Sequence, residues 1–127
     1  MSGLGQILMA KGCDIIAVGG ATSVRRAAAL MHRHRVGCVV VEDRHDPVGV
    51  FSERDLVRVI ASGRDPDATA VSEVMSAPPK TCRVTDDVEQ CARRMSDEKV
   101  RHLIVLDDDE PIGMVSMRDL LEARLAP

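Results

Sequence analysis

The sequence predicts a small α/β fold of the α+β type, built from two repeats that each carry a mixed sheet with helices packed on it. Three observations predict this fold. The 127-residue chain matches itself at a constant offset of 64 over about forty positions, and internal repeats of this kind indicate a duplicated structural unit. Within each copy a helical spacing of apolar residues precedes two short β-branched runs. Only a short polar turn separates those runs, which predicts an antiparallel hairpin.

The match between the two copies is concentrated at apolar helix positions, at turns and in one polar segment. With residue 21 aligned on residue 85, the identical pairs are Val24/Val88, Ala28/Ala92, Met31/Met95, Val36/Val100, Val41/Val105, Asp43/Asp107, Pro47/Pro111 and Gly49/Gly113. The polar segment comes last, where Ser52 to Leu56 aligns with Ser116 to Leu120. Identities at turns and in a polar segment indicate that the copies share one backbone path.

Each copy is predicted to run helix, strand, turn, strand, helix. The first helices cover residues 24–34 and their equivalents, capped by Thr22 or Ser23 in one copy and by Asp86 or Asp87 in the other. The strands cover residues 37–41 and 48–51 in the first copy, and 102–106 and 112–115 in the second. The last helices begin at Ser52 and Ser116, each followed three residues later by an Asp, a pattern that resembles a capping box.

A short lead-in precedes each copy. It is predicted as a helical turn over residues 4–10 or 71–76, followed by a brief strand over residues 15–18 or 81–84. Residues 62–69 contain Gly63, Asp65, Pro66 and Asp67, which mark a connection between the copies. The expected organisation is therefore repeat 1 at residues 4–62, a linker at 63–70 and repeat 2 at 71–125.

The composition limits both the core and the classes of partner. Apolar residues make up 45 % and charged residues 29 %, the formal net charge is −3, and Phe51 is the single aromatic residue. The core must therefore be aliphatic, and aromatic platforms for stacking nucleic-acid bases are missing. We expect no nucleic-acid or membrane binding and a cytoplasmic location. Four cysteines without C-x-x-C spacing are interpreted as small reduced hydrophobes, with a zinc site as the less favoured alternative: Cys13, Cys38, Cys82 and Cys91.

The order of elements and the repeated motif resemble the cystathionine β-synthase (CBS) domain, whose usual unit is a tandem pair. The motif reads Gly-x-[Phe/Val]-Ser-x-Arg-Asp from Gly49 to Asp55 and from Gly113 to Asp119. The resemblance covers residues 4 to 125. The whole chain is similar to stand-alone bacterial CBS-pair proteins, and the stretch of residues 100–103 adds to that likeness. It implies a pseudo-twofold pair with two clefts that bind AMP, ADP, ATP, S-adenosylmethionine or a dinucleotide, and a disc-like homodimer.

By this resemblance Asp55 and Asp119 would hold the ribose, while Ser52 and Ser116 would approach the phosphates. The residue types suit those roles, because a helix start presents unpaired N–H groups to an anion and a carboxylate accepts hydrogen bonds from both ribose hydroxyls. The alternative is that each Ser and Asp only caps its helix. Both uses engage the same helix end, so the sequence leaves the two open.

The remaining candidate ligand contacts differ between the copies. Arg101 and His102 stand where the second strand of repeat 2 begins, and Arg offers a bidentate fork to phosphate. Gly37 and Cys38 are their equivalents in repeat 1 and carry no positive charge. We therefore expect the cleft that uses Arg101, Ser116 and Asp119 to bind phosphorylated ligands more tightly. A surface salt bridge is the alternative for Arg101.

Six further positions complete the set of candidate ligand contacts. Lys80 and Thr81 would border the same cleft, whereas Ile15 and Ile16, their nearest equivalents in repeat 1, suit contact with adenine better than with phosphate. Arg54 and Arg118 would either neutralise phosphate or lie on the outer helix face, and spacing does not decide between these.

The other sequence features that we considered do not indicate a metal site or a catalytic site. The histidines His32, His34 and His45 lack the spacing of a metal site, and with nearby arginines they are interpreted as a solvated basic face for a partner or a dimer contact. Residues 107–110 form an acidic hairpin tip rather than a calcium loop. Since no catalytic motif is present, we expect no enzyme and no required cofactor. The expected function is adenine-nucleotide sensing, with AMP as the first ligand and an unidentified target protein; a ligand-independent scaffold is the main alternative, and nucleotide hydrolysis a weaker one.

Overall fold

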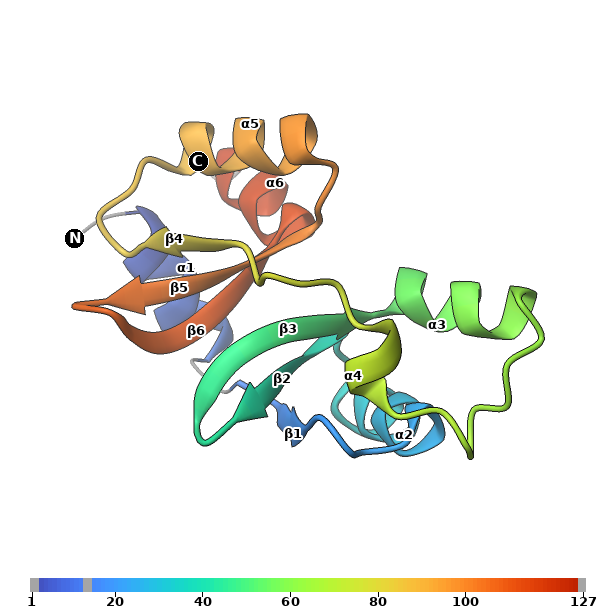
Figure 1. Cartoon of the computed structure of the whole chain (residues 1–127). Coiled ribbons are helices and arrows are strands. Elements are labelled where there is room, and N and C mark those ends of the chain that lie inside the picture. The colour runs from blue at the N-terminus through green and yellow to red at the C-terminus, as the bar shows by residue number, and fades with distance from the viewer. Residues whose placement is uncertain (1–2, 13–14, 126–127) are drawn as a thin grey trace. The chain divides into compact units, whose positions relative to one another are not determined.

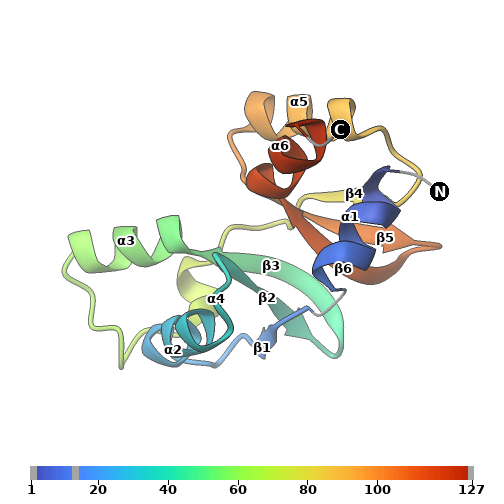
Figure 2. The same cartoon turned by 180° about the vertical axis from the view of Figure 1, so that it is seen from behind.

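The computed structural model describes residues 3–12 and 15–125 of the chain (Figures 1 and 2). The chain divides into two compact units. The first unit is Ile16–Pro79, and the second unit combines Met1–Ile15 with Lys80–Pro127. Each unit is described by itself below.

The first unit contains one mixed three-stranded sheet in the order β1-β2-β3. Its elements are β1 (Ala17–Gly19), α2 (Val24–His34), β2 (Cys38–Asp43), β3 (Asp46–Ser52), α3 (Glu53–Ala61) and α4 (Val71–Val74). Strand β1 pairs with β2 in parallel, and β2 pairs with β3 antiparallel. The antiparallel hairpin predicted from the short turn is therefore confirmed.

The second unit repeats this sheet in the order β4-β5-β6. Its elements are α1 (Gly3–Lys11), β4 (Thr81–Arg83), α5 (Val88–Glu98), β5 (His102–Asp107), β6 (Glu110–Ser116) and α6 (Met117–Leu125). The register is the same as in the first unit: Val40 pairs with Val50, and Ile104 pairs with Met114. Both the predicted fold class and the duplication are confirmed.

The hairpin turns are tighter than the sequence predicts. The structure narrows them to two residues each, Arg44-His45 and Asp108-Asp109, and all four have positive φ between 48° and 70°. Positive φ at both central residues is the requirement of a type I′ turn, which matches the twist of the flanking strands. Both strands of each hairpin are consequently longer than predicted.

The helix caps follow the predicted pattern. Ser23 caps α2 by accepting a hydrogen bond from the Arg26 N–H, and Asp87 caps α5 by accepting one from Glu89. Both helices end on a left-handed residue, Arg35 or Lys99. The structure thus selects one cap from each pair of candidates.

The lead-in strand of the first copy differs from its predicted bounds. Residues 15–18 were expected, but β1 is Ala17–Gly19, and Ile15 and Ile16 precede it. The Ile16 carbonyl still accepts a hydrogen bond from the Val40 N–H at 2.9 Å, so the parallel ladder continues without strand geometry at Ile16. The prediction was therefore wrong about where the strand begins.

Each lead-in helix packs in the unit that holds the other repeat. Helix α1 stands at the start of repeat 1 in sequence, yet Leu4 and Leu8 are buried in the core of the second unit, against β6 and α6 (Figure 1). Helix α4 stands at the start of repeat 2, yet Val71 is buried in the core of the first unit, which also holds Phe51. Since α1 and α4 cover equivalent sheets, the two repeats exchange their first helices.

The described helices offer no candidate for a membrane span, since none is both long and apolar enough.

Candidate functional site

The two Ser-x-x-Asp elements form the first turns of α3 and α6. At α3 the Asp55 N–H donates to Ser52 Oγ at 3.3 Å and the Ser52 N–H donates to Asp55 Oδ2 at 2.9 Å. At α6 the corresponding distances between Asp119 and Ser116 are 3.1 and 2.8 Å. Both predicted capping boxes are confirmed, with Asp in place of Glu. Capping leaves one face of each carboxylate for a further donor, and that donor differs between the units.

In the first unit the carboxylate of Asp55 is enclosed. Its residue is 2 % exposed, and the Ser76 hydroxyl donates to Oδ1 at 3.0 Å and to Oδ2 at 3.2 Å. Arg58 Nη1 lies 3.5 Å from Oδ1. Ser76 is held in place by two backbone hydrogen bonds with Val50, each of 2.9 Å. A buried carboxylate with this many donors has its hydrogen-bonding capacity largely satisfied by the protein.

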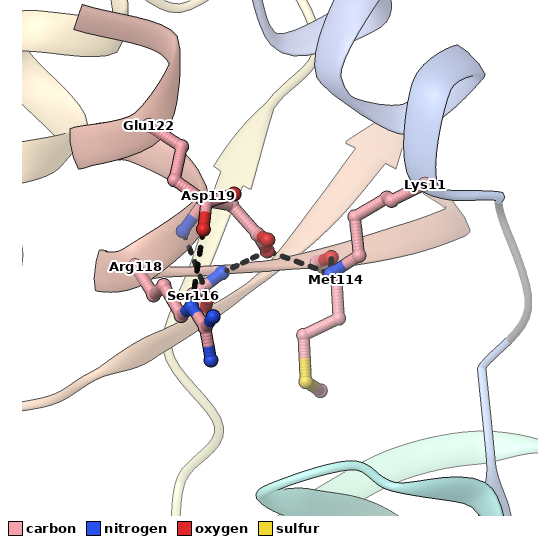
Figure 3. Close-up of polar contacts among 6 residues, drawn as sticks. All are labelled: Lys11, Met114, Ser116, Arg118, Asp119 and Glu122. Carbon is pink, nitrogen blue, oxygen red and sulfur yellow. Dashed lines mark hydrogen bonds and ion pairs between the residues drawn. The ribbon is translucent and has the colours of Figure 1, made fainter. Parts of the chain in front are cut away.

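In the second unit Lys11 reaches the carboxylate of Asp119 from the last turn of α1 (Figure 3). Lys11 Nζ lies 2.6 Å from Asp119 Oδ2 and 3.0 Å from the carbonyl oxygen of Met114. The side chains of Lys11 and Asp119 are 39 % and 17 % exposed. This carboxylate is therefore open to solvent from one side.

The pKa of Asp119 reflects two opposing effects. Burial raises the pKa, but the hydrogen bond from Lys11, the backbone N–H of Ser116 and the charge of Lys11 lower it more. The net result is a pKa below the ordinary value for Asp, so the group is ionised at neutral pH. The second unit thus presents an accessible carboxylate paired with an ammonium group.

Lys11 replaces two groups that Ser76 supplies in the first unit. Met114 and Asp119 are the equivalents of Val50 and Asp55 at the offset of 64. The Ser76 N–H bonds the Val50 carbonyl and its hydroxyl bonds Asp55, whereas one Lys11 ammonium bonds both Met114 and Asp119. A neutral, backbone-anchored cover in one copy corresponds to a charged side chain in the other.

The structure brings four predicted contact residues of the second unit to one place. Ser116 pairs with His102 across the β5–β6 hairpin, and the Met117 N–H donates to the Arg101 carbonyl at 2.8 Å. Arg101, His102, Ser116 and Asp119 therefore lie around the start of α6. The Arg101 side chain is exposed, and the ion pairs found among the described residues do not include it.

Two of the three remaining predicted residues of this unit, Thr81 and Lys80, have partners of their own. Thr81 pairs with Ile104 in the sheet, and its carbonyl accepts a hydrogen bond from Arg94 Nη1 at 2.8 Å. Lys80 Nζ is paired with Glu98 Oε1 at 3.1 Å, and a ligand phosphate would have to compete with that carboxylate.

In the first unit the equivalent backbone contact is kept: the Glu53 N–H donates to the Gly37 carbonyl at 3.0 Å, and Cys38 pairs with Ser52. Ile16 packs against the core and Ile15 is half-buried. Gly37 stands in the place of Arg101 and carries no charge.

The arginine of the motif lies on the outer helix face in both units. Arg118 is 87 % exposed at its side chain and pairs with Glu122 one turn further along α6, at 3.1 Å. Arg54 is likewise exposed. The structure therefore favours the outer-face interpretation of Arg118.

Lys11 and Ser76 are the functional candidates that sequence reasoning missed. Both belong to the lead-ins, outside the Ser-x-x-Asp motif and far from it in sequence. Only the exchange of lead-in helices brings them to the carboxylates, and neither residue type nor spacing indicates that exchange.

The described cysteines are not joined to one another by disulfide bonds. Cys38, Cys82 and Cys91 are buried, while Cys13 lies outside the described residues. Burial, together with the neighbouring Cys91, raises the pKa of Cys82 to about 12. Within residues 3–12 and 15–125 there is no group of three or more His, Cys, Asp or Glu side chains suited to a metal ion.

Comparison with known proteins identifies the family. The sequence model of the CBS domain matches residues 4–62 and 71–126. The chain belongs to the CBS domain family. A solved CBS-domain containing protein from Agrobacterium tumefaciens is 31 % identical, with a TM-score of 0.89 over 94 % of this chain and 97 % of that one. The expected family membership and fold are therefore confirmed.

Two further matches are informative. A CBS domain protein from Pyrobaculum aerophilum, solved in complex with AMP, is 30 % identical with a TM-score of 0.76, covering 88 % of this chain and 92 % of that one. Arabinose 5-phosphate isomerase KdsD from Pseudomonas aeruginosa is 34 % identical over 94 % of this chain and 40 % of its own length. The chain spans about half the length of the curated relatives it matches first.

Proposed function

We propose that this CBS pair is a non-catalytic regulatory module that binds an adenine nucleotide, AMP in the first instance, at the start of α6. The observation that carries the proposal is the half-open carboxylate of Asp119, fixed at the first turn of a helix and flanked by Ser116 and Arg101. The AMP complex of the Pyrobaculum aerophilum relative, at 30 % identity, supports this ligand class.

Each residue type is suited to a different part of the nucleotide. The Asp119 carboxylate accepts hydrogen bonds from the two ribose hydroxyls, and hydrogen bonds to a charged group are worth about 1.5–3 kcal/mol each. Ser116 and the first N–H groups of α6 face the phosphate, with Arg101 as a bidentate donor from the adjoining strand. His102 and Thr81 add polar contacts, and Lys80 contributes once it leaves Glu98.

The second unit is the better binder of the two. Asp55 is enclosed by Ser76 and is 2 % exposed, so a ribose would have to displace a donor that the backbone holds. Ser52, Arg54, Gly37, Cys38, Ile15 and Ile16 stay predicted contacts of a weaker site. This agrees with the inequality expected from the missing positive charge in repeat 1.

Occupancy of the site is read by a partner. A ligand shifts a protein between two states only by the difference in its affinity for them. We propose an unidentified target protein as the reader and a homodimer as the working assembly. Two exposed apolar side chains one turn apart on α3, Val57 at 64 % and Ile60 at 58 %, support a dimer contact. Light scattering of the wild type and of Val57→Glu tests it: a monomeric wild type would refute the homodimer.

Calorimetric titration with AMP, ADP, ATP, NADH and S-adenosylmethionine tests the ligand proposal. We expect AMP to bind the wild type, Asp119→Asn to weaken binding at least tenfold, and Asp97→Asn on the exposed face of α5 to bind as the wild type does. Circular dichroism confirms that each variant is folded.

Two outcomes would overturn the proposal. If none of these ligands binds, the module is a ligand-independent scaffold. If AMP binds equally well to folded Asp119→Asn, the site lies elsewhere. An ATP-hydrolysing activity that copurifies with the protein through several columns, and that Asp119→Asn loses, would show that the function is nucleotide hydrolysis and not sensing.

A further inference from the structure

Asp119 already has a cationic partner, and any ligand that binds this carboxylate must compete with it. Lys11 Nζ lies 2.6 Å from Asp119 Oδ2 and also bonds the Met114 carbonyl at 3.0 Å (Figure 3). A ribose that takes both oxygens of Asp119 displaces this ammonium from the carboxylate. The displaced ammonium then needs another acceptor, because breaking a close, charge-assisted hydrogen bond is unfavourable unless a new partner forms.

The position of Lys11 lets it leave without disturbing the core. It is the last residue of α1, its side chain is 39 % exposed, and Gly12 follows with a φ of +95°. Leu4 and Leu8, which anchor α1 in the core, lie on the preceding turns. A lysine presents three donors on a flexible four-carbon stem, so its ammonium can turn towards a new anion while the helix stays packed.

We propose that Lys11 is a specificity-determining residue that makes this site select phosphorylated nucleosides over uncharged ones. An uncharged nucleoside removes the partner of Lys11 and supplies no negative charge in return. A nucleoside monophosphate supplies one, so Lys11 passes from the Asp119 carboxylate to the ligand phosphate. In the first unit the neutral Ser76 hydroxyl occupies the place equivalent to that of the Lys11 ammonium, while the cation near Asp55 is Arg58 of the same helix.

This inference rests on the proposed function, and it assigns Lys11 a role that the motif itself does not contain. Substitution of Lys11 should therefore change the affinities for adenosine and for AMP in opposite directions. Removing the ammonium should help adenosine, which no longer has to break an ion pair, and should weaken AMP, which loses a phosphate contact. A purely structural role for Lys11 would change both affinities in the same direction.

The test is calorimetric titration of adenosine and AMP into the wild type, Lys11→Gln and the control Arg124→Gln. Gln keeps a hydrogen-bond donor and removes the charge. Arg124 also lies in the second unit and pairs with Glu89 at 2.8 Å, so its variant loses one positive charge and one ion pair away from the site. We expect Lys11→Gln to lower the ratio of AMP affinity to adenosine affinity at least tenfold, and Arg124→Gln to leave it within twofold.

A second readout follows Lys11 directly. The chain has three lysines, Lys11, Lys80 and Lys99. Reductive ¹³C-methylation therefore gives three dimethyl-lysine signals, and the one missing in Lys11→Gln is that of Lys11. We expect its chemical shift to move further on addition of AMP than on addition of adenosine.

The outcomes separate the inference from the proposed function. If both ligands bind and Lys11→Gln leaves their affinity ratio unchanged, the role of Lys11 is refuted and the proposed function stands. If the Lys11 signal responds equally to both ligands, the transfer to phosphate is refuted. If neither ligand binds the wild type, the proposed function and this inference both fail.

Discussion

The Ser76 hydroxyl donates to both carboxylate oxygens of Asp55, at 3.0 and 3.2 Å. Its backbone is tied to Val50 by two further hydrogen bonds, so the group that covers Asp55 belongs to the scaffold of the first unit. The group that covers Asp119 is instead the long side chain of Lys11, and the Asp119 side chain stays 17 % exposed. The two copies thus share the motif but differ in the group that covers its carboxylate, so that Asp55 is enclosed and Asp119 is partly exposed.

Replacing Ser76 by Ala should destabilise the first unit. Asp55 is buried, and loss of a donor to a buried charged group costs roughly 1–3 kcal/mol. Urea unfolding followed by circular dichroism should show a lower midpoint for Ser76→Ala. Ser96→Ala, at an exposed position of α5, is the matched control and should unfold as the wild type does. Equal midpoints for the two variants would show that Ser76 does not support Asp55.

The glycines of the motif should differ in their tolerance of a side chain. A Cβ at Gly49 would lie 2.9 Å from the Ser76 carbonyl oxygen and 2.5 Å from Met75 Sδ, whereas a Cβ at Gly113 would meet Leu8 Cδ2 at 2.7 Å. A leucine side chain can change its rotamer, but a backbone carbonyl held by Val50 cannot move without breaking the bridge.

We therefore expect Gly49→Ala to lower the free energy of unfolding by about 2 kcal/mol or more, and Gly113→Ala by about half of that. Thermal unfolding of the two variants checks this order. A larger loss for Gly113→Ala would mean that α1 is packed more rigidly than α4.

Most of the fold could be predicted from the internal repeat of the sequence. Residues next to the turns, such as Pro47 and Pro111, and the helix-start pairs Ser52/Asp55 and Ser116/Asp119 reflect local backbone requirements, so spacing alone locates them. The same local character explains why both capping boxes were predicted correctly. Strand ends were less predictable, because the two-residue turns depend on Arg44 and Asp108 adopting positive φ, which neither residue type favours as glycine does.

What covers the candidate site could not be predicted from the sequence. Lys11 lies 108 positions from Asp119, and Ser76 lies 21 positions from Asp55. Their contacts depend on which sheet each lead-in helix packs against, a choice made by the burial of Leu4, Leu8 and Val71. Apolar periodicity tells that a helix face is buried, but not which of two equivalent sheets receives it.

The thiols of Cys82 and Cys91 should resist alkylation in the folded protein. Both are buried, and burial raises the pKa of each, that of Cys82 to about 12. The thiolate is the reactive form, so little of it exists at pH 8. Iodoacetamide labelling at pH 8, read by peptide mass spectrometry, should be at least tenfold slower at these two cysteines than in urea-unfolded protein. Equal rates would mean that this part of the second unit opens readily.

The ion pair between Lys11 and Asp119 should make part of the stability dependent on acid pH. The pKa of Asp119 is lower in the folded protein than its ordinary value near 4, because Lys11 and the Ser116 N–H favour the ionised form. A group of this kind contributes stability that is fully present above the unfolded pKa and is lost as pH falls through the folded pKa. Lys11→Gln should therefore lower the free energy of unfolding at pH 7, by roughly 0.5–1 kcal/mol for a pair this exposed, and the difference from the wild type should shrink towards zero below pH 4.

Urea unfolding of both proteins between pH 3 and pH 7 measures that difference, and ¹³C NMR titration of the Asp119 carboxylate should give a higher pKa in Lys11→Gln. The matched control is the same substitution in an Asp119→Asn background, where the carboxylate is absent and the effect of Lys11→Gln should not vary with pH. A difference that stays constant from pH 7 to pH 3 in the presence of Asp119 would mean that Lys11 acts on stability through packing of its stem along α1 and β6, and not through its charge.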